Sequence, residues 1–192
     1  MLPTITTQRL TLRPFEQADA PRLAYLAGDY DVAKMCGRVP HPYSVATAYA
    51  WLDKLDSARD GSADFPFAVT APIDGLIGCC GVSRTGDPAD AAWELGYWFG
   101  MPYWGLGYAS ETAKAVMDWA RCELGAKVFL AGHFADNPAS GNVLRKLGFA
   151  RTGSAELFGL ARQASARGER YVWPEGAAAA RLADLHCSHP PH

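Results

Sequence analysis

Apolar residues recur along the chain with two periods, and each change of period marks a predicted element. Residues 9–13 alternate strictly between polar and apolar, which is typical of a half-buried strand, and Pro14 ends it. Helical spacing follows in two places. One short helix is predicted with Asp19 as its N-cap, and a second runs from Ser44 to about Gly61.

A hairpin and an aromatic strand are predicted in the middle of the chain. Residues 67–70 and 76–82 flank Asp74-Gly75, a dipeptide that supplies the positive φ of a tight turn. Residues 93–99 are rich in aromatic side chains and favour a strand. This strand runs directly into a glycine-containing turn at residues 104–109.

The second half of the chain continues as helix, strand, helix, strand. An amphipathic helix is expected from Tyr108 to Gly125, a buried strand at 128–132, and a helix from Asn137 to Gly148. One or two strands follow from Phe149. The resulting order, β-α-α-β-β-β-α-β-α-β, predicts an α+β fold with a mixed central β-sheet flanked by helices.

Composition narrows the class of protein. A chain of 192 residues with 49% hydrophobic residues suffices for one domain with a real core, so we expect a single domain over 1–192. A formal net charge of −2 favours neither nucleic acid nor a membrane surface as partner. The longest apolar stretches are too short to span a bilayer and the N-terminus lacks a signal pattern, so a cytoplasmic protein is expected.

The cysteines and the C-terminal tail do not predict a metal site. Five cysteines without a Cys-x-x-Cys pair are typical of small buried side chains. The tail, about 177–192, brings together His186, Cys187, His189 and His192, but Pro-rich ends seldom order by themselves. We therefore expect a frayed terminus and no bound metal.

The turn at 104–109 is the strongest candidate for chemistry. Gly105 and Gly107 let the main chain approach a phosphate closely, and the helix that follows offers unpaired N–H groups and a positive dipole end. A tight turn of purely structural purpose remains the alternative. Ser110 stands where a dinucleotide fingerprint has its third glycine, and a Walker lysine is absent, so nucleotide binding is disfavoured.

Several motifs in order resemble one family. Residues 103–111 (YWGLGYASE), 137–140 (NPAS) and 143–149 (VLRKLGF) look like the GNAT acetyltransferase superfamily. They are most similar to its branch of ribosomal-protein alanine and serine N-acetyltransferases, and residues 7–14 and 40–43 fit that branch too. The resemblance covers a core of about 7–153 and implies the GNAT (acyl-CoA N-acyltransferase) fold.

The resemblance implies acetyl transfer from acetyl-CoA, as cosubstrate, directly to a primary amine and without a metal. The coenzyme then lies in a wedge between the strands around 93–99 and 127–132. Trp104 occupies the position where the family usually has Gln or Arg, so the grip on pyrophosphate should be almost entirely main-chain. The cofactor-binding candidates are Phe99, Gly100, Met101, Trp104, Gly105, Leu106, Gly107, Tyr108, Ala109, Asn137 and Ser140.

Two residues are the catalytic candidates. Glu94 precedes the cofactor turn and can act as proton acceptor, directly or through water; the alternative is a strand carboxylate paired with an Arg, and Asp136 is a weaker candidate base. Many family members donate a proton from a Tyr at the position of Leu144, which cannot donate. Ser140 is then the candidate acid, with a helix serine bonded to backbone as its alternative.

The acceptor is left open by the sequence. It is a protein N-terminus or a small amine, and Trp51, Tyr25, Tyr30, His41 and Tyr43 are candidates for lining its pocket or for the core. The rival hypothesis is a non-catalytic acyl-CoA-binding sensor or interaction domain with the same fold. Strand edges in the C-terminal part also leave a homodimer open.

Overall fold

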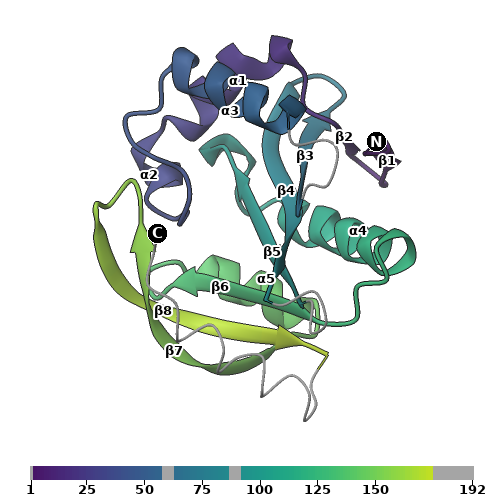
Figure 1. Cartoon of the computed structure of the whole chain (residues 1–192), viewed down its shortest axis with the longest axis vertical. Helices are drawn as coiled ribbons and strands as arrows, with labels where there is room; N and C mark the ends of the chain where they lie inside the picture. The colour runs from purple at the N-terminus through teal and green to yellow at the C-terminus, as the bar shows by residue number, and fades with distance from the viewer. Residues whose placement is uncertain (1, 58–62, 87–91, 175–192) are drawn as a thin grey trace.

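The computed structural model describes residues 2–57, 63–86 and 92–174. Within these ranges the strands form one mixed sheet of eight strands in the order β1-β2-β3-β4-β5-β6-β8-β7, with helices on both faces (Figure 1). The α+β expectation is confirmed. The strands are β1 (Ile5–Thr6), β2 (Thr11–Arg13), β3 (Asp64–Ala71), β4 (Gly75–Thr85), β5 (Ala92–Phe99), β6 (Phe129–Phe134), β7 (Ala150–Gly159) and β8 (Ala164–Trp173).

Strands β1 to β5 follow one another in antiparallel order, and β6, β8 and β7 form the other part of the sheet. The two parts meet at the parallel pair of β5 and β6. Their register holds only at Trp93 opposite Phe129 and Glu94 opposite Leu130. Beyond Glu94 the strands separate, so the sheet splits at its centre.

Helices on the two faces bury separate apolar clusters. Helix α4 (Tyr108–Glu123) and helix α5 (Pro138–Lys146) cover one face, where the larger core contains Phe67, Phe129 and Val116. Helices α1 (Ala20–Ala27) and α3 (Val45–Ser57) pack together on the other face over a second cluster. The short helices η1 (Gln17–Asp19), α2 (Tyr30–Ala33) and η3 (Met101–Tyr103) lie in the connections.

The local turn signals of the middle and second half are confirmed. Gly75 has a φ of 65° in the β3–β4 hairpin. Gly125 and Gly148 have φ values of 65° and 83° just after α4 and α5. The Asn137 side chain caps α5 by accepting a hydrogen bond from Ser140 N at 3.2 Å.

The N-terminal predictions need correction. The strand expected at 9–13 begins at Thr11, because residues 7–10 form the turn of a hairpin with β1. Asp19 precedes α1, but its carboxylate makes no cap there. It accepts from Glu16 N at 2.9 Å and pairs with Arg13 at 2.8 Å, since the nearby guanidinium competes for it.

Some predictions fall outside the described residues. Helix α3 is described up to Ser57, and the remainder of the predicted helix to Gly61 lies beyond that point. The tail at about 177–192, with its His and Cys residues, is likewise outside. Across the parts of the chain that are described, no helix is long and apolar enough to cross a membrane.

Candidate active site

A groove of about 1090 Å³ runs through the split in the sheet. On one side it is lined by the glycine turn and the start of α5, and on the other by α1, α3 and the segment after α2. Strand β5 contributes every residue from Glu94 to Phe99 to the lining. The groove therefore joins the predicted coenzyme turn to the face that carries α1 and α3.

The glycine turn is shaped by two residues with positive φ. Gly105 and Gly107 have φ values of 75° and 81°, and Gly107 is the N-cap of α4. A side chain at either position would be strained in this conformation. The turn thus places the first N–H groups of a sixteen-residue helix at the groove, as an anion site requires.

The Trp104 side chain does not replace the Gln or Arg that the family usually has at this position. Its indole Nε1 donates to the carbonyl oxygen of Phe99 at 2.7 Å and is thereby bonded to the end of β5. The side chain braces the turn against the strand it leaves.

Arg9, in the turn between β1 and β2, forms hydrogen bonds that hold the glycine turn. Its Nη1 donates to the Leu106 carbonyl at 2.9 Å, and its Nε donates to Glu111 Oε2 at 2.7 Å. The guanidinium also lies 4.6 Å from the centroid of the Tyr108 ring. A cation of which about half is exposed therefore stands beside the predicted pyrophosphate site.

Glu111, in the first turn of α4, accepts further hydrogen bonds from the segment that carries Arg9. Its Oε1 accepts from Thr7 Oγ1 at 2.6 Å and from Arg9 N at 3.0 Å. Burial works to raise the pKa of Glu111, but the hydrogen bonds from Thr7 and Arg9 outweigh it and the pKa is lowered. The carboxylate is ionised at neutral pH and also complements the N-terminal end of the helix dipole.

Two hydroxyl groups, one on β5 and one on α5, meet at the groove. Tyr97 Oη lies 2.9 Å from Ser140 Oγ and donates to the Ser140 carbonyl oxygen at 3.2 Å. Burial raises the pKa of Tyr97, so its phenol is neutral and remains a donor. Ser140 therefore stands in the groove together with the cap residue Asn137, and a tyrosine hydroxyl supports it.

Glu94 lines the same groove from the other face of β5. Because alternate strand residues share a face, Glu94 lies with Gly96 and Trp98, opposite the face of Tyr97. Its Oε1 is 3.9 Å from Arg170 Nη1, which is beyond hydrogen-bond distance, and 35% of the side chain is exposed. The carboxylate is loosely paired and open to the groove.

Asp136 is differently placed. Arg162 Nη2 donates to both of its carboxylate oxygens, at 2.9 and 2.8 Å. A carboxylate committed to one guanidinium in this way is a poor proton acceptor. Asp136 is therefore held by Arg162, whereas the Glu94 carboxylate is only loosely paired.

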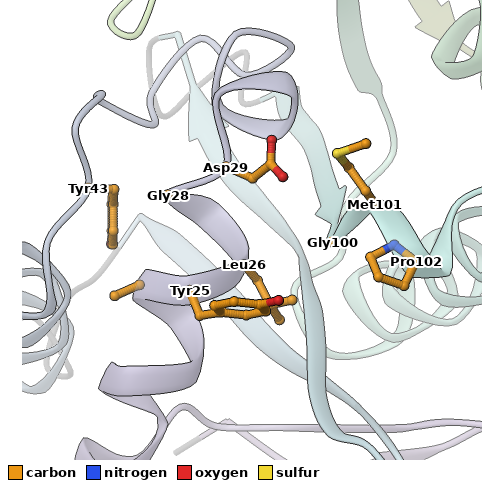
Figure 2. Close-up of a pocket in the computed structure, with 9 residues that line it drawn as sticks. Tyr25, Leu26, Gly28, Asp29, Tyr43, Gly100, Met101 and Pro102 are labelled. Atoms are coloured by element: carbon orange, nitrogen blue, oxygen red, sulfur yellow. The ribbon is translucent and has the colours of Figure 1, made fainter.

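The aromatic candidates for the acceptor pocket divide between two cavities. Trp51 and Tyr43 line the large groove. Tyr25 and Tyr43 line a smaller cavity of about 510 Å³ between the end of α1 and η3, where Tyr25 and Asp29 face Met101 and Pro102 (Figure 2). Tyr30 and His41 are not among the lining residues of either cavity. Their rings pack against each other, with centroids 5.1 Å apart.

Comparison with known proteins decides the family. Residues 9–150 match the acetyltransferase (GNAT) domain family. The chain belongs to the GNAT acetyltransferase family. It is accordingly a GNAT-type N-acetyltransferase. An uncharacterized N-acetyltransferase p20 of Bacillus licheniformis is 30% identical over 151 residues, which are 78% of this chain and 84% of that protein.

Two solved structures share the GNAT fold. The ribosomal-protein-S5-alanine acetyltransferase from Vibrio fischeri has a TM-score of 0.76 at 20% identity, over 89% of this chain and 96% of that one. The microcin C7 self-immunity acetyltransferase MccE, in complex with acetyl-CoA and AMP, has a TM-score of 0.75 at 15% identity, over 86% and 92%. The first belongs to the branch that the motifs resemble.

Two site residues were missed by the sequence reasoning. Arg9 appeared only as part of an alternating strand and of the family-like segment 7–14, and Tyr97 only as one aromatic residue of β5. No local signal assigned Arg9 to the site, because its partner Glu111 lies 102 positions away. No short-range signal pointed to Tyr97, because Ser140 lies 43 positions away. No group of residues able to hold a metal is found among those that the structure describes.

Proposed function

We propose that this GNAT protein transfers an acetyl group from acetyl-CoA directly to a primary amine in a ternary complex. The observation that carries the proposal is the glycine turn opening α4 beside the split between β5 and β6. An extended coenzyme arm needs an anion site and an adjoining gap between strands, and the groove joins the two. MccE, which shares the fold, holds acetyl-CoA.

The coenzyme contacts follow from the lining residues. Main-chain N–H groups of the turn from Gly105 to Ala109 bind the pyrophosphate, and the Arg9 guanidinium beside them adds positive charge. Asn137 uses its side-chain oxygen as helix cap, which leaves its amide nitrogen as a donor for the amides of the pantetheine arm. The pantetheine arm then passes Phe99 and Gly100 and carries the thioester along β5 to the stretch between Tyr97 and Glu94.

The chemistry needs one acceptor and one donor of protons. Glu94 takes a proton from the attacking amine, directly or through water, as the nitrogen bonds to the thioester carbon. The carbon–sulfur bond breaks with its electron pair going to sulfur. Ser140 donates a hydrogen bond to that thiolate, and Tyr97 positions the serine hydroxyl. The products are an amide and CoA, after the thiolate takes up one proton.

An assay of CoA thiol release tests this function. Purified protein is given acetyl-CoA with a panel of small amines and N-terminal peptides, and Glu94→Gln and Ser140→Ala are run alongside. We expect release that depends on the amine and falls in both variants. Absence of CoA release with every acceptor would refute the proposed acetyl transfer.

A non-catalytic acyl-CoA-binding domain is the second candidate. It is favoured by Leu144, which is apolar and 1% exposed where many family members have a tyrosine acid. This candidate predicts that acetyl-CoA raises the melting temperature while no amine gives turnover. Stabilisation by ATP or NAD, with none by CoA, would instead indicate a nucleotide-binding protein and contradict both candidates.

A further inference from the structure

The face of the groove opposite the coenzyme turn is an apolar wall. Seven residues that are partly buried against the second core cluster also line the groove, and we call the six that lie outside η3 the acceptor wall. They are Val39, Tyr43, Trp51, Leu55, Cys79 and Trp98. They come from α3, β4, β5 and the segment between α2 and α3, so the wall is a product of the tertiary fold.

The floor of the groove beside this wall is left open at Gly96. This residue lies in the middle of β5, on the same face as Glu94 and Trp98, and it is exposed. A Cβ added at Gly96 would meet no atom within 4 Å. A glycine inside a central strand weakens the strand, and it is typical of a place where a ligand comes close to the backbone.

The turn between β7 and β8 and the segment after α2 also border this part of the groove, and hydrogen bonds hold them together. Arg162 Nε donates to the Lys34 carbonyl at 2.6 Å, and Leu160 N donates to the Gly37 carbonyl at 3.0 Å. These bonds tie the turn between β7 and β8 to the segment after α2, and Leu160 and Gly37 both line the groove. The acceptor wall therefore faces a preformed space.

The ionisable groups near the wall include the Lys54 side chain, which also lines the groove from α3, and several groups that are neutral or paired. Burial raises the pKa of Cys36 to about 12 and that of Cys79 in the same direction, so both thiols stay neutral. Arg38 donates to Ser83 Oγ at 2.9 Å. The wall thus offers apolar contact next to the Glu94 carboxylate, which lies on the same face of β5 as Trp98.

We infer that the acceptor is a primary amine with a bulky apolar group, aromatic or branched aliphatic, on or next to the carbon that bears the nitrogen. The amine lies at Glu94, the chain passes over Gly96, and the apolar group packs on Trp98 and Trp51. This inference rests on the proposed function and deepens it. It disfavours small N-terminal residues and the ε-amine of lysine, which bring no apolar group to the wall.

A panel of amines of graded size tests the inference. We compare kcat/KM for phenylalaninamide, leucinamide, alaninamide and glycinamide, with Nα-acetyllysinamide as the ε-amine. We expect phenylalaninamide and leucinamide to exceed alaninamide by at least about tenfold, the usual discrimination of an apolar pocket. A preference for alaninamide, glycinamide or the ε-amine would overturn the inference while leaving acetyl transfer in place.

Gly96→Val tests where the apolar group lies. Valine is favoured in strands and its Cβ has room, so we expect the variant to fold. It should lower kcat/KM for phenylalaninamide by at least about tenfold, since the methyl groups occupy the space next to Trp98, with a smaller effect on glycinamide. The KM for acetyl-CoA should stay within about twofold of the wild-type value, because the coenzyme lies on the opposite face of β5 from the Gly96 side chain position.

Matched variants keep this experiment decisive. Gly96→Ala should give an intermediate effect, and Ser165→Val, an exposed position of β8 outside the groove, should give none. If Gly96→Val does not fold, Trp98→Leu serves in its place and should lower the rate with phenylalaninamide more than with glycinamide. Equal losses for both amines would contradict the inference, and a panel without any CoA release would remove the proposed function as well.

Discussion

The two ends of the groove are built in different ways. The coenzyme end consists of one continuous segment, β5, the glycine turn and α4, and main-chain geometry shapes it. The acceptor end collects side chains from α3, β4, β5 and the segment before α3. Backbone N–H groups suit a ligand part that never varies, such as a pyrophosphate, whereas side chains suit a part that differs from one enzyme to the next.

This difference has a consequence for substitutions. Changes at the coenzyme end should alter acetyl-CoA binding through strain and charge, and changes at the acceptor end should alter the choice of amine. Residues at the junction, Glu94 and Ser140, should affect turnover and leave both binding steps nearly unchanged.

Glu94→Gln should have the largest effect. We expect kcat to fall by on the order of 100- to 1000-fold, because the amide cannot accept a proton, with the KM for acetyl-CoA unchanged. Steady-state CoA release measures both. Arg170→Gln is the control: if Glu94 serves only as the ion partner of Arg170, the two substitutions will give equal losses, and the assignment of the base fails.

Gly107→Asp should weaken acetyl-CoA binding by on the order of 100-fold, since like charges about 4 Å apart at a protein surface repel by a few kcal/mol. Gly107→Asn is the matched control, as Asn also tolerates the φ of 81° and adds no charge. Calorimetric titration gives both dissociation constants. Equal weakening in the two variants would show that strain, and not phosphate charge, is responsible.

The hydroxyl pair across the wedge should have a moderate effect on turnover. Ser140→Ala should lower kcat by about tenfold through loss of a donor to the leaving thiolate. Tyr97→Phe should lower it less, because Tyr97 acts by positioning the serine. The double variant should resemble Ser140→Ala alone, since the two groups are coupled. Fully additive losses would contradict the positioning role of Tyr97.

Arg9→Met should raise the dissociation constant of acetyl-CoA by about fivefold, since an exposed cation near phosphate contributes about 1 kcal/mol. Part of the effect should come from a looser turn, which Arg9 holds through Leu106. Glu111→Gln frees the guanidinium without removing it and should weaken binding less. Titrations at low and high salt separate the two contributions, because only the charge is screened.

Acidification should remove a small part of the stability through Glu111. Its pKa is lowered on folding, so the unfolded chain binds the proton more readily and stability rises with pH. The contribution is present above the ordinary value of 4.5 and is lost as pH falls through the lowered pKa. Glu111→Gln should flatten the loss of unfolding free energy below pH 4.5 by about 0.5 kcal/mol.

Local signals determined which elements were predictable. The Asp74-Gly75 hairpin, the glycine turn and the Asn137 cap each depend on neighbouring residues, and the structure contains all three. Asp19 is the N-cap residue of α1 as predicted, but its side chain makes no capping bond there, because Arg13 and Glu16 compete for its carboxylate. The four-residue helix α2 is too short to produce a periodic pattern.

The site was predictable to the same degree. Glu94 and Ser140 line one groove with the turn. Glu94 was a candidate from its place on the strand before the turn, and Ser140 from the family resemblance. Arg9 was not predictable as part of the site, because Glu111 lies 102 positions away and only the tertiary fold brings them together. The acceptor wall has the same origin. Its residues carry apolar patterns that a core requires anyway, and only packing shows which of them face a cavity.

The central claim is that the groove has separate coenzyme and acceptor ends, and one crossed kinetic measurement tests it most directly. The KM values for acetyl-CoA and for phenylalaninamide are measured in wild type, Gly107→Asp and Gly96→Val. We predict that Gly107→Asp raises only the KM for acetyl-CoA and that Gly96→Val raises only the KM for the amine. If each variant raises both values to the same extent, the two ends are not separate and the account is contradicted.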